Sequence, residues 1–352
     1  MDKNLKLIKN DNDPFNLQLF CELTKTSYGC FDLDNIFAVF KSINNILYLV
    51  YSTKKRYIIC FDLDKFKKIT EIRNHHKLHI TNIRHYQDKI NKLDLIISIT
   101  DRDNNLRLWN FNDWSCILNI QHVNINGYLC SACIIKENCQ NYILTTNYDM
   151  FDNFKNSEPI KVFNFKGEKV KEINNSNNMT FFIDTFYDNN KSKNYIITGN
   201  LGFIKSYDYD KNEDYHIYCD NKEFNNKGSH TSIIVNNDQG IIKLIESCSD
   251  GNIRVWNFNS SELLKKIKVF HDWLFGICLW NNDYIFAGCK DTKIILVDIK
   301  IGYIAKYLEG PKSGIFTIKK IYHSKYGECL ISQGYDMDQI KLYVNKNIFN
   351  QK

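Results

Sequence analysis

Histidine, serine and aspartate recur close together in this chain of 352 residues, and a suitable arrangement of the three performs nucleophilic hydrolysis. His230 precedes Asp250 by 20 residues, and His271 precedes Asp291 by the same distance. A hydrolase needs one exposed nucleophile with a base and oxyanion donors, and the chain contains no Gly-x-Ser-x-Gly turn. A pair that is copied along the chain instead predicts a structural hydrogen bond in successive units, and we expect no catalytic residues.

Cysteine spacing suggests a second chemistry, a metal site. Cys130 and Cys133 are three residues apart, and Cys139 follows. Residues three apart on an extended strand point to opposite faces, so these two thiols should diverge rather than share a zinc ion. The chain also lacks a phosphate-binding glycine loop and a His-Glu-x-x-His motif. We therefore expect no metal, no cofactor and no enzymatic activity, and we interpret the 12 cysteines as mostly buried free thiols.

One repeated pattern positions these residues. In 249–257 a turn containing Asp precedes an alternating strand that ends in a large side chain followed by Asp or Asn, and 103–110 and 291–298 repeat it. Looser copies fill the gaps. We call the large side chain the anchor, and the seven anchors are Phe61, Trp109, Phe163, Tyr207, Trp256, Val297 and Tyr343. Their spacing of roughly 41 to 54 residues is close to the period of about 40–45 for four-stranded propeller blades. The sequence predicts an all-β, seven-bladed β-propeller of four-stranded antiparallel blades.

The two ends of the chain complete this ring. The chain ends soon after Tyr343, which leaves the last blade without an outer strand, whereas 15–23 alternates apolar and polar residues and belongs to no complete blade. Pairing the N-terminal strand with the last blade would close the ring and remove an exposed sheet edge. We expect a single propeller domain over 1–352, with an N-terminal segment 1–23, seven repeats over 24–344 and a tail 345–352.

Charge and hydropathy restrict the location. The net charge is a mild +6, and the longest apolar runs, such as 46–51, are far shorter than the roughly 18 residues of a membrane span. The N-terminus has no apolar core of signal-peptide length. We expect a protein of the cytoplasm, with the nucleus as the alternative, that does not insert into a membrane.

Over essentially its whole length the chain resembles the WD-repeat family of seven-bladed propellers. In that family a buried network joins a His before the inner strand, a Ser or Thr on the second strand, an Asp in the next turn and a Trp on the third. The resemblance implies network roles for His230, Asp250 and Trp256, for His271 and Asp291, and for Asp103 and Trp109 with His76 or His79. The chain departs from the family with Glu246, Ala287 or Ile99 at the Ser or Thr position, Val297 at a Trp position and Pro311 at a His position.

The resemblance implies a non-enzymatic scaffold that binds other proteins within an intracellular multiprotein assembly through its loop-rich face. The irregular segment 147–159 carries Tyr148, Phe151 and Phe154, and Trp273 lies where a link between blades meets an inner strand. Aromatic residues of this kind are typical of protein interfaces. The alternative is that the segment packs onto its own blade and that Trp273 packs between blades five and six. The alternative function is a nucleic-acid-associated subunit of an RNA-processing or ribosomal complex, which would use the positive charge.

Overall fold

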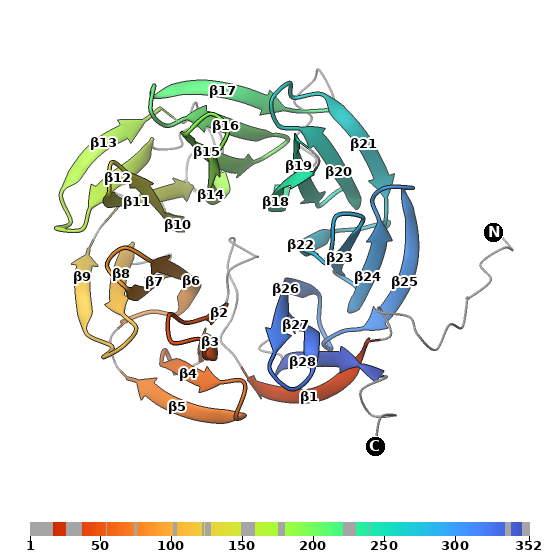
Figure 1. Cartoon of the computed structure of the whole chain (residues 1–352), viewed down its shortest axis with the longest axis horizontal. Helices are drawn as coiled ribbons and strands as arrows, with labels where there is room; N and C mark the ends of the chain where they lie inside the picture. The colour runs from red at the N-terminus through yellow and green to blue at the C-terminus, as the bar shows by residue number, and fades with distance from the viewer. Residues whose placement is uncertain are drawn as a thin grey trace, which may run out of the picture.

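The computed structural model describes residues 17–25, 37–53, 55–73, 76–100, 104–121, 123, 128–148, 159–174, 180–220, 230–238, 240–334 and 339–346. These residues form seven four-stranded antiparallel sheets arranged as the blades of a ring (Figure 1). The predicted seven-bladed β-propeller is confirmed. The described part of the chain contains no helix that is long and apolar enough to cross a membrane.

The blades follow one another around the ring in chain order. Blade one contains β2 (Phe37–Lys41), β3 (Leu47–Ser52), β4 (Ile58–Asp62) and β5 (Lys67–Ile72). Blade two contains β6 (Ile80–Asp88), β7 (Leu93–Thr100), β8 (Asn105–Asn110) and β9 (Cys116–Ile120). Blade three contains β10 (Tyr128–Glu137), β11 (Gln140–Tyr148), β12 (Ile160–Asn164) and β13 (Lys169–Ile173). Blade four contains β14 (Thr180–Asp188), β15 (Lys193–Asn200), β16 (Ile204–Asp208) and β17 (Glu213–Tyr218).

The remaining blades repeat this order. Blade five contains β18 (His230–Asp238), β19 (Ile241–Cys248), β20 (Asn252–Asn257) and β21 (Leu263–Lys268). Blade six contains β22 (Leu274–Leu279), β23 (Tyr284–Cys289), β24 (Lys293–Asp298) and β25 (Tyr303–Glu309). Blade seven contains β26 (Ile315–His323), β27 (Gly327–Gly334), β28 (Gln339–Asn345) and, from the start of the chain, β1 (Leu17–Lys25).

Apolar side chains are buried between neighbouring blades. One cluster contains Tyr195 and Ile197 of blade four together with Leu244 and Trp256 of blade five. Another joins Leu49 of blade one to residues of blade seven across the closure of the ring. Because each core is shared, a single blade could not bury its faces alone, which is the physical reason for a closed ring of repeats.

Strand β1 closes the ring as predicted. It pairs antiparallel with β28, with Leu17 opposite Asn345 and Leu19 opposite Tyr343. Leu17 is buried in the core between blades six and seven. This pairing covers the free edge of β28, which would otherwise expose unpaired backbone groups.

Every outer strand carries a β-bulge at the same place. In blade three, Phe163 pairs with Lys169 and Val162 with Lys171, so Val170 has no partner in the ladder. Each of the other outer strands also leaves one residue unpaired next to the partner of the anchor. These residues are Ile69, Ile117, Tyr215, Leu264, Ala305 and, in β1, Phe20. The bulge in β1 shows that this strand takes the geometry of an ordinary outer strand.

A tight approach of the backbone explains one glycine of the repeated turn. Gly251 has φ +76°, and a Cβ atom there would lie 2.1 Å from the carbonyl oxygen of Phe270. Only glycine tolerates both the left-handed conformation and this contact. The turn between β19 and β20 is thereby packed against the link that leads into blade six.

Candidate functional site

The two faces of the ring differ in the connections that they carry. Because the strands of a blade alternate in direction, the turns between second and third strands lie on the same face as the links between blades. We call this the loop face, and the opposite one, which carries the other two turns of each blade, the hairpin face. The chemistry-bearing residues lie on one of these two faces or inside the blades.

Blade two contains a buried hydrogen-bond network. His76 Nε2 lies 2.8 Å from Ser98 Oγ, and Trp109 Nε1 donates to the same oxygen at 2.8 Å. All three side chains are buried, whereas His79 is exposed. Ser98 therefore occupies the position that the sequence had assigned to Ile99.

The assignment to Ile99 was wrong by one residue. Arg107 pairs with Ser98 in the ladder, which places the serine on the face of the sheet that carries Trp109, and Ile99 faces the other way. Asp103, the expected fourth member of the network, lies outside the described residues.

Blade five uses a carboxylate where blade two uses a hydroxyl. Trp256 Nε1 donates to Glu246 Oε1 at 3.1 Å, and Glu246 is fully buried. The side chain of His230, expected to pair with Asp250, lies outside the described residues, although its backbone begins β18. Asp250 forms an ion pair with Arg254. Burial alone would raise the pKa of Asp250, but the hydrogen bonds and charge of Arg254 lower it to about 2.

In the other blades, the presence of this hydrogen bond depends on the residue type of the anchor. Tyr207 forms a hydrogen bond with Thr198, and Ser332 Oγ donates to the hydroxyl of Tyr343 at 3.4 Å. Phe163 cannot form such a bond, and the buried hydroxyl of Thr145 opposite that strand has no hydrogen-bond partner. These networks lie inside the blades, so their hydrogen bonds stabilise the fold. They present no exposed nucleophile.

The predicted buried pair in blade six is wrong. His271 is exposed, and the carboxylate of Asp291 lies 3.3 Å from the ammonium group of Lys293. Ala287 and Val297 replace the hydroxyl and the indole of blade two, so a buried imidazole would have no polar partner there. The histidine therefore remains at the surface.

Buried cations two residues before the anchor fix several links of the loop face. Lys161 Nζ donates to the carbonyl of Val123 at 2.8 Å, and Lys341 Nζ donates to the carbonyl of Gly310 at 3.1 Å. Arg254 Nε donates to Asp220 at 2.9 Å. The alternating strands of the sequence contain these cations, but only the register shows that they point inward.

Trp273 is the exposed aromatic residue that the sequence predicted for the loop face. Its side chain is 41% exposed, and its ring lies 5.9 Å from that of Phe275. Lys290 Nζ lies 5.8 Å from the Trp273 ring centroid and 3.0 Å from Asp272. The hydrogen bond from Lys290 lowers the pKa of Asp272, whose carboxylate also accepts from the backbone N–H of Trp273 at 2.8 Å.

Of the aromatic residues predicted in segment 147–159, only the backbone of Tyr148 lies within the described part of the chain. The backbone of Tyr148 ends β11 and pairs with Tyr128, on the loop face, and its side chain lies outside the described part. Phe151 and Phe154 also lie outside the described residues. Of the four predicted contact residues, Trp273 is the one whose side chain lies within the described part of the chain.

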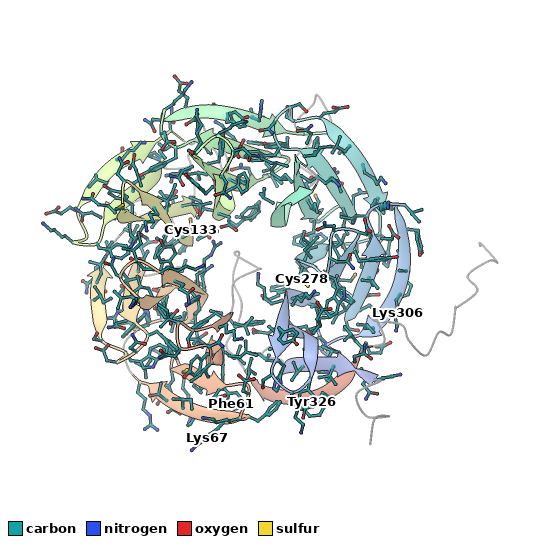
Figure 2. All side chains as sticks on the ribbon, in the orientation of Figure 1. Phe61, Lys67, Cys133, Cys278, Lys306 and Tyr326 are labelled. Atoms are coloured by element: carbon teal, nitrogen blue, oxygen red, sulfur yellow. The ribbon has the colours of Figure 1, made fainter. Side chains whose placement is uncertain are left out.

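Cys130 and Cys133, the two cysteines with metal-like spacing, both contact blade four, so the predicted divergence to opposite faces is wrong. A register shift between Leu129 and Ser131 interrupts the alternation of β10 on which that prediction rested. Cys133 lies on inner strand β10 (Figure 2) and packs in the cluster between blades three and four. Cys130 belongs to a different cluster, and its thiol donates to the carbonyl of Phe181 at 2.9 Å. Within the described residues, no group of three or more His, Cys, Asp or Glu side chains is arranged to hold a metal ion.

The hairpin face holds a cleft that the sequence did not indicate. It has a volume of about 810 Å³ and lies where blades two, three and four meet, with Tyr86, Glu137, Cys139, Asn194 and Asp210 among its lining residues. Asn194 Nδ2 donates to the carbonyl of Lys136 at 2.9 Å and so joins two of these blades. The residues come from separate turns and strands of three blades, which no local pattern connects.

No protein-family profile matches the chain, and a search of curated proteins finds no match.

Proposed function

We propose that this chain is a non-enzymatic interaction scaffold of the WD-repeat type that binds a partner protein through its loop face, around Trp273. The observation that carries the proposal is an indole that is 41% exposed at the start of an inner strand. Tryptophan is enriched at the energetic centres of interfaces because it buries a large apolar area with few rotatable bonds. The intracellular assembly, in the cytoplasm or the nucleus, is part of the same proposal.

The surroundings of Trp273 favour a preorganised contact. Phe275, against which the indole packs, lies 4.3 Å from Phe316 between ring centroids, and both phenylalanines are buried. The bond from the Trp273 backbone to Asp272 and the ion pair of Asp272 with Lys290 fix the link on which the indole sits. A side chain that is already ordered loses less conformational entropy when a partner binds.

The charges near Trp273 favour a protein partner over a nucleic acid. Lys290 is paired with Asp272, and Lys293 is paired with Asp291. A phosphate backbone needs cations that are not already neutralised. The nucleic-acid alternative therefore finds no support in this part of the loop face.

Replacement of Trp273 by alanine tests the proposal. Tagged wild-type protein and Trp273→Ala would be expressed in the source cells, and co-purifying proteins would be quantified by mass spectrometry. Loss of a true anchor costs about 2 kcal/mol or more, so at least one partner should decrease roughly 30-fold. The matched control is Tyr322→Ala, which removes a 67% exposed aromatic residue from the hairpin face.

The melting temperatures of both variants should equal that of the wild type. An unchanged set of partners in a folded Trp273→Ala variant would refute the assignment of this surface. Recovery of RNA rather than protein, lost in the same variant, would support the nucleic-acid alternative.

A further inference from the structure

The outer strand of blade two differs from the other six in its charge. Strand β9 has the sequence Cys-Ile-Leu-Asn-Ile and contains no charged residue. Each of the other outer strands contains at least two, including the pairs Lys67 and Lys68 in β5, Lys306 and Glu309 in β25, and Glu22 and Lys25 in β1. Figure 2 shows Lys67 and Lys306 at the outer rim of the ring.

The apolar edge of β9 is accessible. Ile117, the bulged residue, is 44% exposed, and Cys116 and Asn119 are also exposed. Among the described residues, β9 makes no backbone hydrogen bond other than those of its ladder with β8. The carbonyl of Leu118 accepts from the Cys116 thiol at 3.3 Å, and a thiol is a weak donor.

An exposed edge without charges is unusual because it is a template for further strand pairing. Folded proteins protect such edges with charged side chains, above all lysine, and six outer strands of this ring follow that rule. The bulge twists β9 but leaves residues 118–120 in regular register with β8. We propose that β9 is a docking strand, to which an uncharged, extended segment of a partner protein adds as a fifth strand of blade two.

The shape of the ring favours a flexible segment over a second copy of this chain. The rim is convex (Figure 1), so two rigid rings would touch only along a strand of 5 residues. Stable interfaces between folded proteins bury about 1,200 Å² or more, whereas this contact would involve one strand of 5 residues. An extended segment follows one strand and gains its affinity from main-chain hydrogen bonds, with side-chain contacts adding specificity.

The chemistry of the edge also restricts the segment. A charged side chain opposite Ile117, Leu118 or Ile120 would lose hydration without gaining a counter-ion on β9. The segment should therefore alternate β-branched or other apolar residues with small polar ones. This surface lies on the rim of blade two, apart from Trp273 on blade six, so the inference does not depend on the proposed loop-face function.

A labelled peptide tests the docking strand. The probe is a fluorescein-labelled hexapeptide of alternating threonine and valine, and the purified full-length protein is titrated into it while anisotropy is recorded. Wild-type protein should bind, and Ile117→Lys should weaken binding at least about tenfold because it adds the charge that protects other edges. The matched control is Ile69→Lys, which changes the bulged residue of β5, itself 50% exposed, and should leave binding unchanged.

Further arms of the experiment separate the other outcomes. The same peptide with alternate backbone nitrogens methylated keeps its side chains but loses ladder donors and should not bind. If Ile117→Lys lowers the melting temperature, Asn119→Lys provides the charge at an exposed position of the same strand. Binding that is equal in the wild type and both β9 variants, or equal for the methylated peptide, overturns the proposal. A dimer in sedimentation velocity that Ile117→Lys dissociates, without peptide binding, overturns it in favour of a second copy.

Discussion

Where the anchor of a third strand carries a polar hydrogen, a polar side chain of the second strand bonds to it in several blades. Trp109 faces Ser98, Tyr207 faces Thr198 and Trp256 faces Glu246, each through a hydrogen bond. A buried indole or phenol needs a partner for its polar hydrogen, whereas a phenyl ring does not. The blades therefore differ from one another in which polar side chain meets the anchor, and blade six, with Ala287, Val297 and an exposed His271, has no such pair.

Removal of one hydroxyl tests this interpretation. Ser98→Ala should lower the free energy of unfolding by roughly 1–3 kcal/mol because it leaves the indole N–H of Trp109 and the ring nitrogen of His76 without their shared oxygen. Thr145→Val is the matched control: it removes a buried hydroxyl that has no partner, so stability should stay equal or rise. Urea denaturation of the two variants measures both effects. A larger loss in Thr145→Val than in Ser98→Ala would contradict the network.

The ion pair of Asp250 gives blade five a defined acid sensitivity. The pKa of this carboxyl is lowered from 3.8 to about 2 in the folded protein, so the folded state binds its proton less readily than the unfolded chain. Its contribution to stability is complete above about pH 4 and is lost as the pH falls toward 2. Asp250→Asn should lower the melting temperature at pH 7 and reduce its further decrease between pH 4 and 2. A variant with the wild-type pH profile would show that Arg254 does not act through this carboxylate.

Only some of these network residues could be predicted from the sequence. The sequence identified Trp109 and Trp256 as network residues, because turn and strand patterns are local. The predicted bond of Asp250 to His230 stays a prediction, since the side chain of His230 lies outside the described residues. The sequence missed Ser98 because a shift of one residue moves a side chain to the other face of a strand. It misplaced His271 because a motif records residue types but not whether a neighbouring side chain can accept the hydrogen bond.

At the scale of elements, the bulge is the feature that unites the outer strands. It recurs in all seven sheets at the partner of the anchor, including β1, which is separated from its blade by most of the chain. The sequence predicted the strands and the closure of the ring, since alternation and leftover segments are visible in it. The bulges could not be predicted, because they are a property of two paired strands and have no strong signature in one of them.

Deletion of residues 1–25 should expose the edge of β28. The buried contacts of Leu17 and the ladder between β1 and β28 would be lost, so the melting temperature and the solubility should both fall. Leu19→Lys is the control, because Leu19 belongs to the same strand but is 44% exposed. Thermal unfolding followed by circular dichroism distinguishes the two. Equal melting curves for the deletion and the wild type would show that β1 contributes nothing to closure.

At the scale of the whole molecule, hydrogen bonds between blade one and blade seven hold the ring closed in addition to the pairing of β1 with β28. We call this contact between the first and last blades the seam. Asp64 of blade one accepts hydrogen bonds from Ser324 Oγ at 2.6 Å and from the Ser324 backbone at 3.2 Å. His323, which is buried, lies 3.1 Å from the carbonyl of Leu63 through Nε2. These partners are 260 residues apart in the chain, so no local pattern could have connected them.

Asp64→Ala should therefore weaken the contact between the first and last blades. Loss of a carboxylate with three backbone or side-chain donors should cost roughly 1–3 kcal/mol of stability. Hydrogen exchange should increase first in β4 and β26, the strands that end just before Asp64 and Ser324. Asp113→Ala removes an exposed aspartate that bonds only within its own turn, to Ser115, and should change neither quantity. Uniform exchange across all blades in Asp64→Ala would argue against a local seam.

Pairing of the first strand with the last has a consequence for synthesis on the ribosome. Strand β1 ends at Lys25, and its partner β28 begins at Gln339. At roughly 5–20 residues per second, β1 leaves the ribosome on the order of 15–60 s before β28 has been made. During that interval blades can assemble one by one behind it, but the ring remains open and Leu17, Leu19 and Phe20 have no native partner strand. Nascent chains should therefore depend on chaperones until translation ends, and a stop codon before residue 339 should leave a nearly complete chain that aggregates.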